Sequence, residues 1–185
     1  MGTTRKEPRT PTKQHKARTH VSLRLHSDVY ERLKKEAKEK QISVSDIASQ
    51  GIRRYVDWDL PAERFGQVSV PKPVIKLLYE KLDEDEAREV GRKQGEAMAE
   101  FVTFYYKSAS LEKYLDLLDL QSIPSQVAYE HTFNGKTHTI ILRHNRGLRT
   151  SQSLGETLRV MMNSIGRLAT IKETDEQVLA TTDKS

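Results

Sequence analysis

The stretch His20-Val-Ser-Leu-Arg-Leu-His-Ser27 decides the fold expected for the first third of this chain. Its side chains alternate, with Val21, Leu23 and Leu25 on one face and His20, Ser22 and Arg24 on the other. This period of two is typical of a half-buried strand. Helical patterns follow at once, so the strand has no partner within its own segment. A second copy of the chain would supply one, and we expect a two-stranded ribbon shared by two chains.

Two capped helices are predicted directly after the strand. Ser27 is expected to be the N-cap of the first, in which Val29, Leu33 and Ala37 recur at every fourth position. Ser43-Val-Ser-Asp46 forms a capping-box pattern for the second, with Asp in place of the usual Glu. The apolar face of the second helix comprises Val44, Ile47, Ala48, Gly51, Ile52, Tyr55 and Val56. A unit of roughly 40 residues buries too little apolar surface to be secure alone, which favours an intertwined dimer.

Residues 19–58 resemble the ribbon-helix-helix domain of the MetJ/Arc/CopG type, a superfamily of prokaryotic DNA-binding proteins. The resemblance rests on strand 20–26, the helix from Ser27, the turn 42–46 and the helix that ends at Tyr55-Val-Asp-Trp58. It implies that the ribbon enters the major groove of double-stranded DNA, and that the outward residues His20, Ser22 and Arg24 read bases. It also implies a phosphate contact at the start of the second helix, made by the backbone of Ser43 and Val44 with the Ser45 hydroxyl nearby. The charge of Asp46 would compete with that phosphate.

The formal charge of +5 is concentrated at the amino terminus. Residues 1–20 hold six basic side chains against Glu7 alone, whereas basic and acidic residues balance in the rest. We expect residues 1–18 to be a disordered basic arm whose Lys13, Lys16 and Arg18 bind DNA phosphates. The alternative is a tail that only aids solubility. The segment lacks the apolar core of a signal peptide.

Composition excludes several classes of function. The absence of cysteine removes disulfide frameworks, cysteine nucleophiles and thiolate metal sites. No apolar run approaches the roughly 20 residues that span a bilayer, and no Gly-rich phosphate loop or His-Glu-x-x-His motif is present. We therefore expect no enzyme activity, no cofactor and no membrane partner, and a cytoplasmic, nucleoid-associated location.

After a linker at 59–66, residues 67–185 are predicted to form an α+β domain for oligomerisation or for sensing an unknown effector. Pro71 and Pro73 open a short helix through Leu82, and an acidic cluster opens a long helix over 83–107. In the long helix Ala87, Gly91, Gly95 and Ala99 recur every fourth residue. This small-residue stripe indicates close packing of another helix, or alternatively room for a ligand. A third helix is expected over 111–120, ending before Pro124.

The last third of the chain is predicted to be a small antiparallel sheet with a covering helix. Asn134-Gly135 is a strong hairpin signal between 126–133 and 136–143, and a two-residue turn there would pair His131 with His138. A helix is expected over 151–165, with Leu154, Leu158, Met161, Met162 and Ile165 buried and Gly166 as its stop. A final strand or hairpin runs from 168 to about 180.

His131 and His138 are the only candidates for a metal site, because opposed histidines on adjacent strands can share an ion. The nickel-responsive ribbon-helix-helix regulators offer an analogy, but this chain lacks a cysteine ligand and has a different element order. We therefore predict hydrogen-bonded histidines and no metal. His144-Asn-Arg-Gly147 is expected to be a strand-to-helix loop, and its polar side chains could alternatively line a ligand pocket.

The leading hypothesis for function is a homodimeric, sequence-specific transcriptional regulator of the repressor kind. The second is an antitoxin or plasmid-maintenance protein, although those carry a short disordered tail and this chain has about 120 further residues that look folded. The third is an enzyme that the DNA-binding unit localises. Its candidate groups are Glu130, His131, His138 and His144, which form no recognisable catalytic set.

Overall fold

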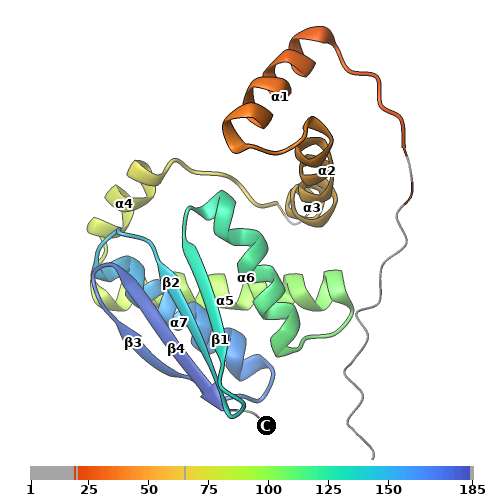
Figure 1. The fold of residues 1–185 in the computed structure, drawn as a ribbon. Coiled ribbons are helices and arrows are strands. Elements are labelled where there is room, and N and C mark those ends of the chain that lie inside the picture. Colours follow the sequence, from red (N-terminus) through yellow and green to blue (C-terminus); the bar gives the residue numbers. More distant parts are fainter. Residues whose placement is uncertain (1–18, 20, 65, 184–185) are drawn as a thin grey trace, which may run out of the picture. The chain divides into compact units, whose positions relative to one another are not determined.

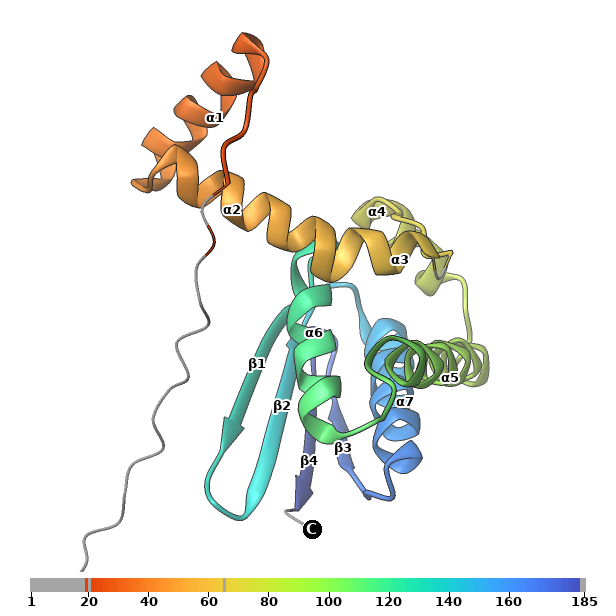
Figure 2. The same cartoon turned by 90° about the vertical axis from the view of Figure 1, so that its right-hand side faces the viewer.

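The computed structural model describes Thr19, residues 21–64 and residues 66–183, which combine helices with one four-stranded antiparallel sheet (Figures 1 and 2). The chain divides into two compact units, with the boundary between Ala48 and Ser49. The helices are α1 (Ser27–Lys40), α2 (Val44–Arg54), η1 (Tyr55–Asp59, a π-helix), α3 (Leu60–Arg64), α4 (Lys72–Glu80), α5 (Glu84–Tyr106), α6 (Leu111–Ser125) and α7 (Leu148–Ser164). The strands are β1 (Ala128–Phe133), β2 (Thr137–Arg143), β3 (Thr170–Glu173) and β4 (Gln177–Asp183).

The predicted amino-terminal strand is not formed in the single chain. Residues 21–26 carry no regular secondary structure, and His20 lies outside the described residues. A strand is defined by hydrogen bonds to a neighbouring strand, and the ribbon prediction assigns that neighbour to a second chain. The structure of the single chain therefore does not support the predicted two-stranded ribbon.

The two helices after it form as predicted, with one cap corrected. His26, not Ser27, is the N-cap of α1, and its side chain makes no capping hydrogen bond. The capping box of α2 is confirmed, since Asp46 N–H donates to Ser43 Oγ at 3.0 Å and Ser43 N–H donates to Asp46 Oδ2 at 3.3 Å. Between the helices, Gln41 adopts a left-handed φ of 56° and Ile42 N–H donates to the Ala37 carbonyl at 3.0 Å.

The linker predicted over 59–66 is wrong, because the chain stays helical to Arg64. Pro61 has no backbone N–H and so cannot donate the usual helical hydrogen bond to the carbonyl four residues earlier. The helix widens just before it, where Leu60 N–H donates to the Tyr55 carbonyl five residues earlier. Trp58 and Ala62 lie four residues apart and are both buried in the hydrophobic core, which gives this segment a reason to remain helical.

The sheet has the strand order β1-β2-β4-β3, with every neighbouring pair antiparallel. Helices α5, α6 and α7 lie on one side of it (Figure 2), where α6 contacts β1 and α7 contacts β3 and β4. The strand residues that face these helices and are almost fully buried are Ile140, Leu142, Val178 and Ala180. They meet Leu158, Met161 and Met162 of α7, all fully buried as the periodicity predicted.

The β1–β2 hairpin forms, but its register differs from the prediction by two residues. Phe133 pairs with His138, and His131 with Ile140. Gly135 and Lys136 are the central turn residues instead of Asn134 and Gly135. Gly135 has a φ of +92°, and the Asn134 side-chain oxygen accepts the Lys136 and Thr137 N–H groups at 2.9 and 2.8 Å. A shift of two leaves every side chain on its predicted face.

The small-residue stripe of α5 packs closely against α7, as predicted. A Cβ added to Gly91 would lie 2.1 Å from the Ser153 carbonyl oxygen, and one added to Gly95 would lie 2.7 Å from the Val160 Cβ. Thr157 Oγ1 donates to the Gly91 carbonyl at 3.0 Å across the same contact. The stripe is thus a helix-packing surface.

Two other helix boundaries differ from expectation. α6 continues to Ser125 and contains Pro124, and α7 begins at Leu148. Pro124 removes only one hydrogen bond of the last turn, which the rest of the helix tolerates. The predicted stop of α7 is confirmed, because Gly166 N–H donates to the Asn163 carbonyl at 2.9 Å and Arg167 N–H to the Met162 carbonyl at 3.0 Å. The final hairpin is also confirmed, with β4 reaching Asp183.

Candidate functional site

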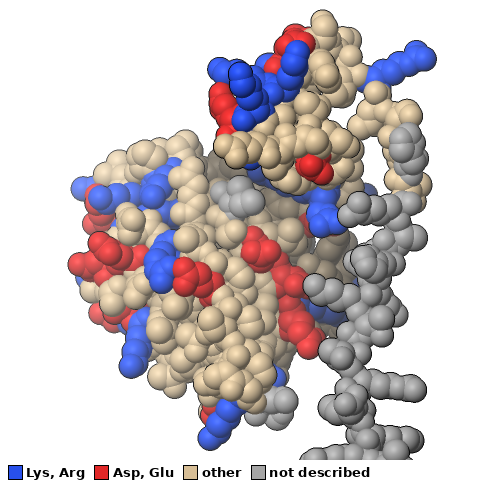
Figure 3. Space-filling view, in the orientation of Figure 1, with Lys and Arg blue, Asp and Glu red and all other residues tan. Residues whose placement is uncertain are grey.

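The predicted base-reading residues Ser22 and Arg24 are both solvent-exposed in the described segment. The third, His20, and the predicted phosphate contacts Lys13, Lys16 and Arg18 lie outside the described residues. On the following helix α1, basic and acidic side chains lie side by side (Figure 3). Their ion pairs include Lys40–Glu36 at 2.8 Å and Lys34–Glu31 at 3.7 Å. Because Lys34, Lys35 and Lys40 pair with glutamates, the charged surface of α1 is mixed.

The predicted phosphate contact lies at the start of α2. Ser43 and Ser45 are exposed there, and Val44 is half-buried. Asp46 already occupies part of this site, since its Oδ2 accepts both the Ser43 N–H and the Ser43 hydroxyl, the latter at 2.7 Å. An incoming phosphate would have to replace this carboxylate at Ser43. The N–H groups of Val44 and Ser45, in the first helical turn, have no carbonyl one turn back within the helix.

The two histidines of the β1–β2 hairpin lie together, although they are diagonal neighbours and not directly opposed. His131 Nε2 and His138 Nδ1 share a hydrogen bond of 3.0 Å, and their rings stack with centroids 5.3 Å apart. His138 also stacks on Phe133, with centroids 4.2 Å apart. Within the described residues no three His, Asp or Glu side chains come close enough together to hold a metal ion. The pair has the geometry of hydrogen-bonded sheet residues.

The residues weighed for catalysis are not assembled into one site. Glu130 points to the opposite face of β1 from His131 and forms a salt bridge with Arg143. His144 is buried at the carboxyl end of β2, where its Nε2 lies 2.8 Å from Ser151 Oγ. These positions give Glu130 and His144 separate structural partners.

The loop from His144 to Gly147 is held in place by the turn between β3 and β4. His144 N–H donates to the Glu176 carbonyl at 2.9 Å and Gly147 N–H to the Asp175 carbonyl at 3.0 Å. Arg146 N–H donates to His144 Nδ1 at 3.1 Å, so His144 carries its proton on Nε2 and donates it to Ser151. The Ser151 hydroxyl in turn donates to the Thr174 carbonyl. This chain of bonds fixes the backbone of the loop at Arg146, just before α7.

Arg146 is the residue whose position the sequence does not reveal. It is only 8% exposed, although arginines in loops are ordinarily solvated. Its Nη2 donates to the Ser125 carbonyl, and burial lowers the pKa of its guanidinium. From the sequence, a ligand pocket at His144-Asn-Arg-Gly147 is only an alternative prediction. No local sequence signal distinguishes a buried arginine from an exposed one.

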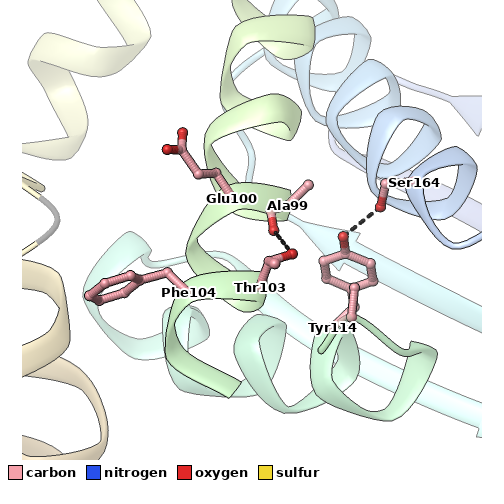
Figure 4. Close-up of a pocket in the computed structure, with 7 residues that line it drawn as sticks. Ala99, Glu100, Thr103, Phe104, Tyr114 and Ser164 are labelled. Carbon is pink, nitrogen blue, oxygen red and sulfur yellow. Dashed lines mark hydrogen bonds between the residues drawn. The ribbon is translucent and has the colours of Figure 1, made fainter. Parts of the chain in front are cut away.

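A shallow hollow of about 410 Å³ lies between α5 and the start of α6 (Figure 4). The hydroxyl groups in its wall already have partners within the chain. Thr103 Oγ1 donates to the Ala99 carbonyl at 2.9 Å, and the Tyr114 hydroxyl lies 2.6 Å from Ser164 Oγ. Figure 4 shows Phe104 and Glu100 directed away from that Tyr114–Ser164 pair. The hollow is therefore a weak candidate for a binding site.

Comparison of the chain with protein-family models and with curated proteins finds no match. In the part of the chain that the structure describes, no helix is long and apolar enough to cross a membrane.

Proposed function

We propose that this protein is a homodimeric DNA-binding transcriptional regulator, whose residues 19–58 form a ribbon-helix-helix domain with those of a second copy. In this proposal the two segments 20–26 pair as an antiparallel ribbon. The ribbon enters the major groove of double-stranded DNA, and His20, Ser22 and Arg24 contact base edges. The amino end of α2 and the basic segment 1–18 contact phosphates.

The observation that carries the proposal is the exposure of the predicted ribbon's apolar face. Val21 is 69% exposed, Leu23 55% and Leu25 44%. In the helices that follow and the turn between them, Val29, Tyr30, Ile42, Ile52, Tyr55 and Val56 are also exposed, and α2 has no buried residue. Soluble monomers rarely leave so many neighbouring apolar side chains in water. A second copy would cover them, because it brings the same alternating strand and the same helix faces.

The second unit, residues 49–185, supports a regulator over an antitoxin. It holds the four-stranded sheet with its covering helices and a hydrophobic core of its own. Antitoxins with this DNA-binding unit carry a short disordered segment in that place, which folds only on its partner. A folded unit of this size suits oligomerisation or the sensing of a signal.

The proposal is tested by selecting bound sequences from a random pool of double-stranded DNA with the purified full chain. We expect an enriched palindromic consensus, because two-fold symmetric ribbons read two equal half-sites. Recovery of random sequences, or of no DNA, would contradict the proposal.

On the selected site, Arg24→Ala should weaken binding about fivefold to a hundredfold, as loss of one bidentate base contact does. Binding to unrelated DNA should change far less. Arg32→Ala, an exposed arginine of α1, is the matched control and should leave the affinity for the selected site nearly unchanged. Equal weakening of Arg24→Ala on all sequences would reassign Arg24 to a phosphate contact.

A further inference from the structure

A cavity with a volume of about 980 Å³ lies within residues 49–185. It is bounded by α3, α4, α5, α6 and α7 together with the segment that connects α3 to α4. Its size matches that of pockets that enclose small organic molecules. Its wall includes Trp58, the last residue of the proposed ribbon-helix-helix domain, but none of the residues proposed to contact DNA.

The cavity has a buried cation in its wall. Arg146 lines the cavity and is only 8% exposed. Its Nε–H has no hydrogen-bond partner among the described residues. No described carboxylate forms an ion pair with it. Leaving a buried donor without a partner is unfavourable, and more so when the group is charged. The loop hydrogen bonds around His144 nevertheless hold Arg146 in this place.

Lys72 adds a second positive charge to the lining of the cavity, and Tyr79 adds a hydroxyl. Lys72, the first residue of α4, also lines the cavity, and its charge helps to lower the pKa of His144. The Tyr79 hydroxyl lies 3.0 Å from Ser153 Oγ and is close enough to Arg146 to affect its pKa. The two acidic lining residues, Asp59 and Glu63, come from η1 and α3, and Asp59 is 3.6 Å from its own partner Arg54.

The rest of the wall is largely apolar. Its larger members are Trp58, Met98, Leu118, Leu142, Leu154 and Leu158. An inorganic anion would satisfy Arg146 but would leave this apolar volume filled with water. A neutral apolar molecule would fill the volume but leave the guanidinium unpaired. Only a ligand with both parts satisfies both observations.

We propose that this cavity is a binding site for an amphipathic organic acid, whose carboxylate pairs with the guanidinium of Arg146 and whose apolar body lies against Trp58, Met98 and Leu158. Charge-assisted hydrogen bonds between arginine and carboxylates are about twice as strong as neutral ones. The site does not depend on DNA binding. Its use as an effector site in gene regulation rests on the function proposed above.

The chain contains a single tryptophan, Trp58, and it lines the cavity. Its fluorescence therefore reports on ligand entry without a label. The full chain is titrated, in the absence of DNA, with saturated monocarboxylates of six to fourteen carbons below their micelle concentrations. The primary alcohols of equal length are titrated in parallel. We expect a saturable change in Trp58 emission and a rise in melting temperature, with each acid binding at least about tenfold more tightly than its alcohol.

The Arg146→Met variant should bind the acids about tenfold to a hundredfold more weakly and the alcohols as before, which removes the preference for the carboxylate. Arg92→Met is the control, since Arg92 is a half-exposed arginine of α5 that pairs with Glu89 outside the cavity. It should keep the wild-type preference. Equal affinity of wild-type protein for acids and alcohols, or no response to either series, would overturn the proposal even if Arg146→Met failed to fold. So would unchanged acid binding by a folded Arg146→Met variant.

Because these titrations contain no DNA, their failure is separate from failure of the proposed function. A chain that selects a palindrome but binds no acid refutes the cavity proposal alone. A chain that binds the acids but selects no DNA refutes the regulator alone.

Discussion

At the residue scale, the environment of His144 shows how one buried imidazole can organise a loop. Its Nδ1 accepts the Arg146 N–H and its Nε2–H faces Ser151, so both ring nitrogens are engaged in the neutral form. Protonation would turn Nδ1 from an acceptor into a donor that points at another donor. Burial, followed by the charges of Arg146 and Lys72, lowers the pKa of His144 to about 4. The folded protein therefore holds His144 neutral.

This makes stability depend on pH in a definite direction. The pKa of an unperturbed histidine is about 6.5, so between that value and about 4 the unfolded chain binds a proton that the folded chain refuses. The free energy of unfolding should thus fall as the pH drops from about 6.5 to about 4, by up to about 3 kcal/mol from this residue. Urea unfolding at a series of pH values measures it.

Substitution isolates this contribution of His144. His144→Gln should be less stable at pH 7, because it loses packing and hydrogen bonds, but its stability should change less between pH 6.5 and 4. His26→Gln, at an exposed histidine, should retain the wild-type pH profile. An unaltered acid slope in His144→Gln would show that other groups cause the dependence.

At the element scale, the closest contact in the second unit joins α5 to α7. Glycine permits it, because at Gly91 the backbones of the two helices approach where a Cβ would overlap the Ser153 carbonyl. The pair is extended to the sheet by Arg88 of α5, whose guanidinium contacts Glu173 of β3 at 3.1 Å with both terminal nitrogens. Helix α7 therefore packs against both α5 and the sheet. This packing positions the loop that contains Arg146, just before the first residue of α7.

Gly91→Ala should consequently lower the stability of the second unit. In an exposed helix the change would stabilise by about 1 kcal/mol, but here α5 must move away from α7, and overpacking of this kind costs about 1–3 kcal/mol. We expect a net loss and a lower melting temperature. Lys93→Ala, on the solvent side of the same helix, should change stability by less than about 0.5 kcal/mol. A Gly91→Ala protein more stable than wild type would contradict the described α5–α7 contact.

At the scale of the whole molecule, the two units differ in how many of their apolar side chains are buried. The second unit buries a core that includes Tyr114, Leu117, Met161 and Val178 at 0% exposure. In the first unit, Ala37 is the one apolar side chain that is buried among the described residues. The described residues of the first unit therefore form no hydrophobic core in the single chain, and the proposed dimer would provide one.

The Leu23→Asp substitution distinguishes a monomer from the proposed dimer. Leu23 is 55% exposed in the single chain, so in a monomer the substitution should have almost no effect. In the proposed dimer it places an unpaired charge in a shared core, and should abolish dimerisation and DNA binding. Sedimentation equilibrium measures the assembly. Ser22→Asp adds the same charge to the opposite face of the proposed ribbon and should leave the dimer intact. A Leu23→Asp chain that assembles like wild type would refute the shared ribbon.

The amino-terminal segment is tested separately by deleting residues 1–17. If its basic side chains contact phosphates, the deletion should weaken binding to all DNA sequences alike and should reduce the steepness with which affinity falls as salt rises. Fluorescence anisotropy over a range of salt concentrations measures both. Loss of sequence preference with an unchanged salt dependence would instead assign base reading to this segment.

The sequence alone determined those features whose physical causes are local. The Ser43–Asp46 capping box, the Gly166 helix stop and the hairpin at Asn134-Gly135 all form, because each depends on a few neighbouring residues. The predicted placement of His131 and His138 on one face of the hairpin also holds, since a register shift of two does not move a side chain to the other face.

Tertiary structure decided what depends on residues far apart in the chain. The helix continues through Pro61 because Trp58 and Ala62 are buried in the hydrophobic core. Local helix propensity does not include this tertiary contribution. Arg146 is buried because the β3–β4 turn, about 30 residues further on, holds its loop against α7. The segment 21–26 is the opposite case. Its alternation indicates a strand, but a strand forms only when another strand supplies its hydrogen bonds. In the single chain, none of the described residues pairs with it.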